Sequence, residues 1–230
     1  MNVFTEKTAV VFGATGLIGR HLLTLLIQDP LYKEIIVVTR GPMEIEHYKI
    51  FHKRINFDNP KAIKDAIPKE SIVFSAIGTT NAKVKGNKEI YRTMDHDITL
   101  NIARGCLENG AFRFLYVSSS GANPESSNFY LRLKGEIDVA VTALNLKSAL
   151  IFRPSLLLGT RKEFRFGEKI AQLLMPIFSF AFPKQMKPIP AKAVAKVMIQ
   201  LSKSKYSGTV VIENSQQLEL ADLMESNALR

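Results

Sequence analysis

Two side chains in the middle of the chain have the types and the spacing needed to transfer a proton. Tyr130 and Lys134 are four residues apart, so a helix would place them on one face, one turn from each other. A tyrosine hydroxyl has a pKa of about 10, too high for efficient proton transfer at neutral pH, and a nearby ammonium stabilises the phenolate and lowers that pKa. The lysine could also hold the ribose hydroxyls of a cofactor. The alternative for this pair is a solvent-facing helix turn.

Three consecutive serines, Ser118–Ser120, come before this pair and directly after the apolar run 112–117. A serine hydroxyl at the end of such a strand would bind a substrate carbonyl and orient it toward the tyrosine. Six tyrosines in a lysine-rich chain make a chance Tyr-x-x-x-Lys match common. The match gains weight because Tyr130 lies eleven residues after Ser119, on the helix that follows the strand.

Three glycines spaced by three residues follow a Val-rich run at residues 8–12. In the resulting strand–turn–helix, Gly13 allows a sharp turn, Gly16 a close approach of a phosphate, and Gly19 tight packing of the helix. The free N–H groups and the positive dipole end of the helix then form a pyrophosphate site. The alternative is a strand–turn–helix without a ligand. We expect cofactor contacts along the turn from Gly13, Thr15, Gly16, Leu17, Ile18 and Gly19.

Arg40 follows a second apolar run, 34–39, about 20 residues after Gly19. An acid at this position would bind the adenosine ribose, whereas an arginine accommodates a 2′-phosphate. The sequence therefore predicts NADP(H), with NAD(H) as the second choice and a surface arginine as the alternative. Further cofactor contacts are expected near later strand ends, where small side chains would let the dinucleotide lie against the backbone or simply make a tight turn: Asp58, Ala76, Ile77, Gly78 and Pro154.

The elements that must position these residues alternate between short apolar runs and helical patterns. This order predicts an α/β fold, a Rossmann-type doubly wound parallel sheet with helices on both faces. Ligands of such sheets bind beyond the carboxyl ends of the strands, so the glycine turn and the serines would face one crevice. The expected strands are 8–12, 34–39, 53–57, 71–77, 112–117, 148–152 and 209–213, the last at an edge. The expected helices are one that begins directly after the glycine turn and includes the apolar run 21–27, then 61–67, 89–109, one beginning near 128, 191–201 and a short one in the tail 214–230.

Composition favours a single globular domain over residues 1–230. One cysteine, Cys106, excludes an internal disulfide, and together with the lack of a signal-peptide pattern it leads us to expect a cytoplasmic location. No apolar run reaches the roughly 18 residues needed to span a bilayer. The net charge of +10 is spread along the chain, so we expect no nucleic-acid partner. The histidine and cysteine spacings predict no metal site.

The chain resembles the short-chain dehydrogenase/reductase superfamily, in its extended and atypical branches, over about residues 7 to 160. The resemblance rests on Gly13-Ala-Thr-Gly16-Leu-Ile-Gly19, Ser118-Ser119 and Tyr130-Leu-Arg-Leu-Lys134. Further motifs look like the Tat-interacting-protein-like oxidoreductases, which bind NADPH: Ser-Ser-x-Gly-Ala, Ser126-Ser-Asn-Phe-Tyr130, Lys134-Gly-Glu136 and Phe152-Arg-Pro154.

This resemblance implies roles for the residues that match. Ser119 would bind the carbonyl, with Ser120 as the alternative, Tyr130 would be the general acid/base and Lys134 its partner. The turn after Pro154 would cover the nicotinamide. Residues 160–205, rich in aromatic side chains at 164–182, would form a small substrate cap; the alternative is a helix packed on the core.

We therefore expect an NADP(H)-dependent oxidoreductase that acts on a small-molecule carbonyl or alcohol, with a homodimer as its expected assembly. Two alternatives stay open. One is a nucleotide-sugar epimerase or dehydratase that uses the same residues, against which Arg40 argues. The other is a non-catalytic NADPH-binding regulatory protein, because a fold and its site residues do not fix a metabolic substrate.

Overall fold

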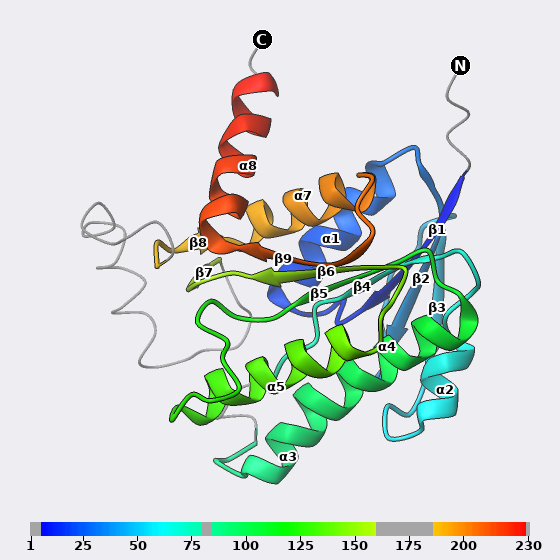
Figure 1. The fold of residues 1–230 in the computed structure, drawn as a ribbon. Helices are drawn as coiled ribbons and strands as arrows, with labels where there is room; N and C mark the ends of the chain where they lie inside the picture. The colour runs from blue at the N-terminus through cyan, green and yellow to red at the C-terminus, as the bar shows by residue number, and fades with distance from the viewer. Residues whose placement is uncertain (1–5, 80–83, 160–185, 229–230) are drawn as a thin grey trace.

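The centre of the molecule is a seven-stranded sheet, seen in a computed structural model that describes residues 6–79, 84–159 and 186–228 (Figure 1). Every neighbouring pair of its strands is parallel. The chain first adds strands to one side of β1 and then, from β4 on, adds them to the other side. The order in which strands are added therefore reverses between β1 and β4. In spatial order the strands are β3 (Ile50–Arg54), β2 (Tyr32–Thr39), β1 (Lys7–Phe12), β4 (Ile72–Ser75), β5 (Arg113–Val117), β6 (Ser148–Arg153) and β9 (Gly208–Glu213).

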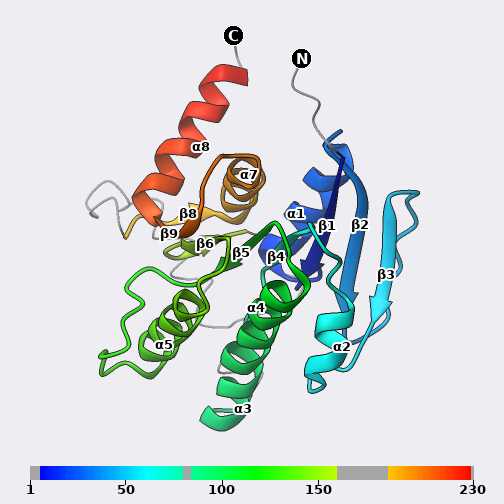
Figure 2. The same cartoon turned by 45° about the vertical axis from the view of Figure 1, so that its right-hand side comes forward.

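Helices cover both faces of this sheet (Figure 2). On one face lie α1 (Leu17–Gln28) and α7 (Ala191–Ser202), packed against each other, and on the other lie α2 (Pro60–Asp65), α4 (Ile98–Asn109) and α5 (Phe129–Ala143). The predicted doubly wound α/β fold is therefore confirmed. Three smaller parts complete it: α3 (Lys88–Arg92) before α4, a parallel pair formed by β7 (Leu157–Leu158) and β8 (Ile189–Pro190), and α8 (Asn214–Ala228), which leaves the end of β9 and extends away from the sheet.

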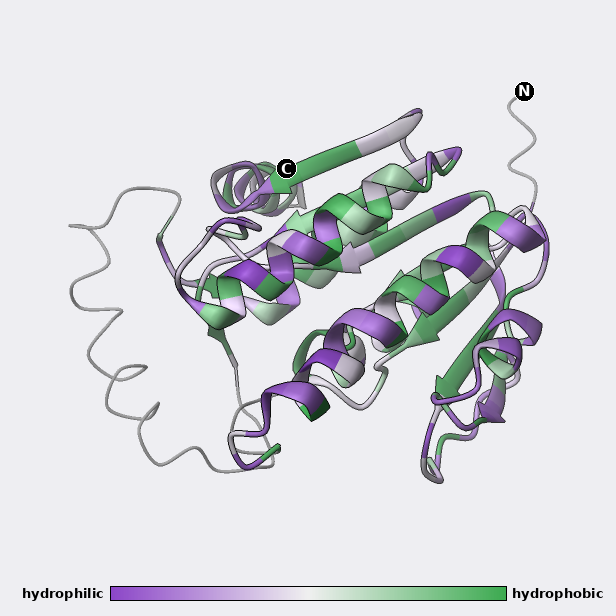
Figure 3. Ribbon diagram, turned by 60° about the horizontal axis from the view of Figure 1, so that its bottom comes forward, coloured by the Kyte–Doolittle hydropathy of each residue, from purple (hydrophilic) through white to green (hydrophobic). Residues whose placement is uncertain are grey.

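Strand β1 shows why the apolar runs are continuous instead of alternating. Ala9 and Val11 belong to the core on the α1–α7 face, whereas Val10 and Phe12 belong to the core on the face of α2 and α4. A strand buried on both faces needs apolar side chains at every position. Figure 3 shows the strands of the sheet mainly in the colour of hydrophobic residues, whereas the helices also carry hydrophilic residues on their outward sides.

Helix ends follow local sequence signals. Asn59, Asn87 and Asn128 precede α2, α3 and α5, and each side chain accepts hydrogen bonds from backbone N–H groups of the first turn. Helix α4 ends at Gly110, whose φ of 65° is left-handed.

Three predicted elements differ from the structure. The third strand is Ile50–Arg54 instead of 53–57, because Phe57 is buried in the connection after the strand, where its ring packs 6.0 Å from that of Phe12. Asp58 therefore lies beyond the strand end instead of at it. The helix expected over 89–109 contains a π-helical turn, η1 (Thr93–Asp97), and the tail forms a helix of 15 residues instead of a short one.

The expected cap over 160–205 falls in two parts. Residues 160–185, including the aromatic segment 164–182, lie outside the described residues. Helix α7, in the second part, packs on α1 and contributes eight buried apolar residues to the core on that face of the sheet. The described part of the chain contains no helix that is both long enough and apolar enough to cross a membrane.

Candidate active site at the carboxyl edge of the sheet

The glycine turn between β1 and α1 is held by close backbone contacts on two sides. Gly13 has a φ of +82°, and a Cβ atom there would lie 2.6 Å from the carbonyl of Ala76 after β4. A Cβ atom on Gly19 would lie 2.0 Å from the carbonyl oxygen of Gly13, and one on Gly16 would lie 3.2 Å from the same oxygen. The turn thus has the sharp bend and the tight helix packing that the spacing predicts.

The first turn of α1 presents backbone donors without a side-chain cap. Its N-cap is Gly16, which makes no side-chain hydrogen bond, and the first turn contains no acidic residue. The Arg20 N–H donates to the Gly16 carbonyl at 3.1 Å, as the first backbone bond of a helix with N-cap Gly16 does. The N–H groups of Leu17, Ile18 and Gly19 at the positive end of the helix dipole therefore fit a pyrophosphate. Thr15, also expected at the cofactor, is exposed beside them.

Arg40 lies at the carboxyl end of β2, where the sequence predicts the 2′-phosphate contact. Its side chain is exposed, and its guanidinium carbon is 6.0 Å from the centre of the Phe57 ring. Directly before it, the Thr39 hydroxyl contacts His52 Nε2 at 2.7 Å across the β2–β3 pair. Asp58, next to Phe57, is exposed and its N–H donates to the side chain of Asn56. The side chain of Arg40 is thus available to an anion beside the turn.

The end of β4 runs past the glycine turn. Ala76 N–H donates to the Phe12 carbonyl at 2.9 Å. Gly78 is exposed, and no atom of the residues that the structure describes lies within 4 Å of its ideal Cβ position. Ile77 is half-buried between them. Thr79 Oγ1 is buried and has no hydrogen-bond partner among the described residues. An exposed glycine and an unpaired hydroxyl beyond a strand end are suited to a ligand at this edge.

The serine run and the turn at Pro154 lie side by side at the ends of β5 and β6. Ser118 N–H donates to the Phe152 carbonyl at 2.7 Å, and Ser120 N–H donates to the Pro154 carbonyl at 2.8 Å. The hydroxyl of Ser118 is buried without a partner in the described part of the chain, and that of Ser119 donates to the Ser120 carbonyl at 3.3 Å. The assignment of Ser119, or Ser120, to the substrate carbonyl stays a prediction.

Tyr130 and Lys134 are brought together as the spacing predicts. Both lie on α5, and the Lys134 ammonium nitrogen is 5.9 Å from the centre of the Tyr130 ring. Tyr130 is 37% exposed, whereas Lys134 is buried. The tyrosine ring also packs edge-on against Tyr91 of α3. The Lys134 nitrogen thus lies over the ring of an exposed tyrosine, and a role of this pair in proton transfer stays a prediction.

A buried carboxylate, Asp95 of η1, completes this group and was not anticipated from the sequence. Its Oδ2 is 2.9 Å from the Lys134 nitrogen, and its Oδ1 accepts a hydrogen bond of 2.6 Å from Thr79 N–H. Burial is the largest single effect on the pKa of Lys134 and lowers it, but the Asp95 carboxylate, together with Tyr130 and Tyr91, outweighs burial, so the pKa is raised above its ordinary value of 10.5. A sequence signal was present, because Asp95 is a charged residue on an apolar stripe with Tyr91, Ile98 and Ile102 at helical spacing.

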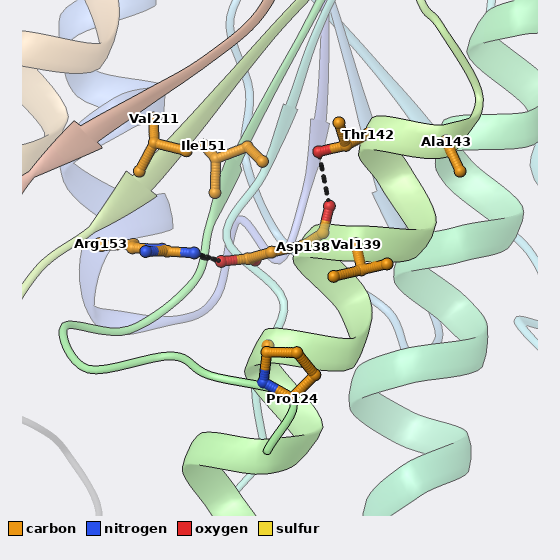
Figure 4. A pocket seen from close by; sticks show the side chains of 9 residues that line it. Pro124, Asp138, Val139, Thr142, Ala143, Ile151, Arg153 and Val211 are labelled. Carbon is orange, nitrogen blue, oxygen red and sulfur yellow. Dashed lines mark hydrogen bonds and ion pairs between the residues drawn. The ribbon is translucent and has the colours of Figure 1, made fainter. Parts of the chain in front are cut away.

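A separate open pocket of about 380 Å³ lies between α5 and the β6–β9 edge (Figure 4). Its walls are mainly apolar, with one ion pair in which Arg153 Nη2 is 2.8 Å from Asp138 Oδ2. The other oxygen of Asp138 accepts a hydrogen bond from Tyr116, and burial together with that carboxylate raises the pKa of Tyr116 well above 10.0. Lys134 does not line this pocket, so the pocket is distinct from the site described above.

No group of three or more His, Cys, Asp or Glu side chains in residues 6–79, 84–159 and 186–228 is placed to share a metal ion.

Comparison with known proteins adds relatives and neighbours. Protein FMP52, mitochondrial, of Candida glabrata is 31% identical over 236 residues, which cover 97% of this chain and 100% of that protein. The Saccharomyces cerevisiae protein of the same name is 31% identical over 201 residues, covering 84% of this chain and 86% of the relative. These names overturn the expected cytoplasmic location and point to mitochondria; a lone cysteine and the lack of a signal-peptide pattern do not distinguish the two compartments.

Among solved structures, a UDP-N-acetylglucosamine 4-epimerase from Methanobrevibacter ruminantium in complex with UDP-N-acetylmuramic acid has a TM-score of 0.70 at 18% identity, covering 96% of this chain and 83% of that one. WbmH of Bordetella bronchiseptica in complex with NAD⁺ has a TM-score of 0.67 at 15% identity, covering 97% and 82%. At these identities the likeness establishes the fold alone. The family model for NAD dependent epimerases and dehydratases matches residues 9–172, most of the chain. With its glycine turn, its sheet order and this match, the chain belongs to the NAD-dependent epimerase/dehydratase family.

Proposed function

We propose that the protein is an NADP(H)-dependent oxidoreductase of the short-chain dehydrogenase/reductase type that interconverts a carbonyl and an alcohol. The observation that carries the proposal is the pairing of the exposed Tyr130 side chain with the buried Lys134 ammonium, whose nitrogen is 5.9 Å from the centre of the tyrosine ring. The pair lies on the helix after β5, at the same sheet edge as the glycine turn. The motif resemblance to the Tat-interacting-protein-like branch also supports the assignment.

In this proposal each residue has one task. The nicotinamide dinucleotide, when bound, supplies or accepts the hydride. Tyr130 donates the proton to the carbonyl oxygen during reduction and removes it from the alcohol during oxidation, and Lys134 stabilises the phenolate. The hydroxyl of Ser119, or of Ser120, holds the carbonyl oxygen toward Tyr130. Pro154, whose carbonyl accepts from Ser120 N–H, fixes the backbone beside that serine.

The cofactor choice in this proposal rests on Arg40. An exposed guanidinium at the end of β2 can bind a 2′-phosphate with charge-assisted hydrogen bonds, and we propose NADP(H) for that reason, with NAD(H) as the second choice. The α1 N-terminus and the glycine turn would hold the pyrophosphate. Ala76, Ile77 and Gly78 would lie along the rest of the dinucleotide.

A turnover screen tests the proposal. Purified protein is assayed with NADPH against a panel of small aldehydes and ketones, and with NADP⁺ against the matching alcohols. Tyr130→Phe is expected to lower kcat at least about a hundredfold while NADPH still binds, since the substitution removes only the proton donor. Tyr206→Phe is the matched control, because Tyr206 is 40% exposed and lies between α7 and β9. Equal turnover by wild type and Tyr130→Phe would remove Tyr130 from the mechanism.

Nucleotide-sugar epimerisation is the second candidate, and the family match together with the epimerase neighbour favours it. An epimerase returns the hydride to its own substrate, so it needs a retained dinucleotide and produces no net change in cofactor absorbance. NAD that copurifies with the protein, combined with epimerisation of a UDP-sugar, would replace the first candidate with this one.

A further inference from the structure

The charged end of Lys134 is enclosed by groups from three elements. Asp95 of η1 contacts its nitrogen at 2.9 Å, Tyr130 lies one turn earlier on its own helix, and Tyr91 of α3 packs edge-on against the Tyr130 ring. Both partners of the ion pair are almost completely buried, with 5% of the Lys134 side chain and 1% of the Asp95 side chain exposed. The Asp95 carboxylate is thus the counter-charge that balances the positive charge of Lys134.

A buried ammonium is unstable without such a partner. Burial disfavours the charged form, and a lysine with no counter-charge in such a place tends to lose its proton. A neutral amine could not stabilise a phenolate on Tyr130. The pair therefore does more than hold two elements together, because the charge of Lys134 depends on it.

The local backbone gives Asp95 its position. Asp95 lies in a π-helical turn. Such turns are rare, interrupt the regular hydrogen bonding of an α-helix and occur frequently at functional sites. Its second oxygen is fixed by Thr79 N–H, beyond the end of β4, so the carboxylate is attached to the sheet edge as well as to the helix. This bond orients the carboxylate toward α5.

We propose that Asp95 is a positioning residue for the reaction: it holds the Lys134 ammonium beside Tyr130 and keeps that ammonium charged although it is buried. The inference rests on the proposed oxidoreductase function, in which Lys134 serves Tyr130. Asp95 acts through Lys134 and is assigned no contact with substrate.

The charge of Lys134 can be measured without any substrate. Lysine ε-carbon resonances are followed by NMR as the pH is raised, and the Lys134 signal is identified by its loss in Lys134→Met. We expect the signal in wild type to stay in its protonated position beyond the pH at which exposed lysines titrate. In Asp95→Asn its midpoint should fall by at least about one pH unit, because burial is no longer offset. An unchanged midpoint would overturn the proposal.

Activity provides the second measurement. In Asp95→Asn, kcat for carbonyl reduction should fall as the pH rises through the lowered lysine midpoint, and Asp95→Glu should recover part of the loss. Glu136→Gln is the matched control, since Glu136 of α5 pairs with Arg92 of the neighbouring α3 in an ion pair that is partly exposed. It should leave both the Lys134 midpoint and kcat unchanged. If Glu136→Gln lowers kcat as much as Asp95→Asn does, the effect is structural and the proposal is wrong.

Folding is the remaining risk, because removing one partner of a buried ion pair is strongly destabilising. Should Asp95→Asn fail to fold, the double variant Asp95→Asn/Lys134→Met shows whether the unpaired ammonium is the cause, because this variant has neither charge of the buried pair. It should fold if the unpaired ammonium caused the failure; an unfolded double variant would mean that Asp95 serves the Thr79 N–H instead. If the wild-type protein binds NADPH but reduces no carbonyl, the proposed function is wrong. The NMR experiment still shows whether Asp95 keeps Lys134 charged, because it uses no substrate.

Discussion

The ideal Cβ position of Gly19 is 2.0 Å from the carbonyl oxygen of Gly13, so the first turn of α1 and the turn before it touch backbone to backbone. Gly19→Ala must therefore displace one of two backbones. We expect it to lower the free energy of unfolding by on the order of 2 kcal/mol and to weaken NADPH binding. Urea denaturation and calorimetric titration measure the two effects. Gly41→Ala, at a position with nothing within 4 Å, should leave stability nearly unchanged.

Arg40 is expected to set the cofactor preference. We predict that NADPH binds at least about tenfold more tightly than NADH and that Arg40→Ala abolishes this difference, since one good charged contact has about that value. Calorimetry with both cofactors measures it. Arg54→Ala is the neighbouring control, because Arg54 pairs with Thr39 across the β2–β3 ladder. A variant without Arg40 that still prefers NADPH would show that the 2′-phosphate has a different partner.

The serine that binds the carbonyl can be identified by substitution. Ser119→Ala should reduce kcat about a hundredfold with little effect on NADPH affinity, because it removes one hydrogen bond to the reacting oxygen. Ser120→Ala is expected to have a smaller effect, and Ser127→Ala, on the exposed loop before α5, none. The reverse order of the first two variants would assign the role to Ser120. Steady-state kinetics at saturating NADPH distinguish these outcomes.

Arg113 should be important for stability and not for chemistry. Its buried guanidinium donates to the carbonyls of Leu201 and Ser202 at the end of α7, at 2.8 and 2.9 Å, and to the Ser148 hydroxyl. Arg113→Met removes this buried donor from both carbonyls and from the Ser148 hydroxyl, and we expect a loss of about 3 kcal/mol in urea denaturation. Arg104→Met removes an exposed arginine on α4 and should cost less than about 0.5 kcal/mol. Similar losses in the two variants would refute this role for Arg113.

The thiol of Cys106 should be protected and should make stability depend on alkaline pH. Burial raises the pKa of this thiol, so the folded protein keeps the proton that the unfolded chain releases. A raised folded-state pKa contributes stability that is complete below the unfolded pKa of about 9 and declines above it. We expect labelling by a thiol reagent only on unfolding, and a shallower alkaline decline of unfolding free energy in Cys106→Ala. Fast labelling of folded protein would contradict this expectation.

The sheet could be predicted because strands buried on both faces leave continuous apolar runs, as in β1 and β2. The edge strand β3 could not be placed in the same way. It is half-exposed and carries Phe51 toward solvent, whereas the apolar Ile55 and Phe57 after it pack on the core from a connection. Apolar side chains there indicated burial but not strand structure.

The candidate site was predictable where one element carries two partners, as α5 does for Tyr130 and Lys134. Asp95 could not be found by that reasoning, because its partner comes from another helix and its own helix has a π-helical turn. A pairing between residues of two elements depends on how these elements pack against each other. The spacing of residues within one element does not determine that packing. Only its place on an apolar stripe marked the residue as unusual.

Helix α7 shares one apolar core with β1 and α1 although it follows them at a long distance in the sequence (Figure 1). Until α7 emerges, the same face of β1 and α1 has no cover, and contacts between such distant segments form late because closing the intervening chain costs entropy. A nascent or truncated chain that ends before Ala191 would expose this face to chaperones and proteases. The core on this side of the glycine turn is thus completed only by a segment that lies far along the chain from β1 and α1.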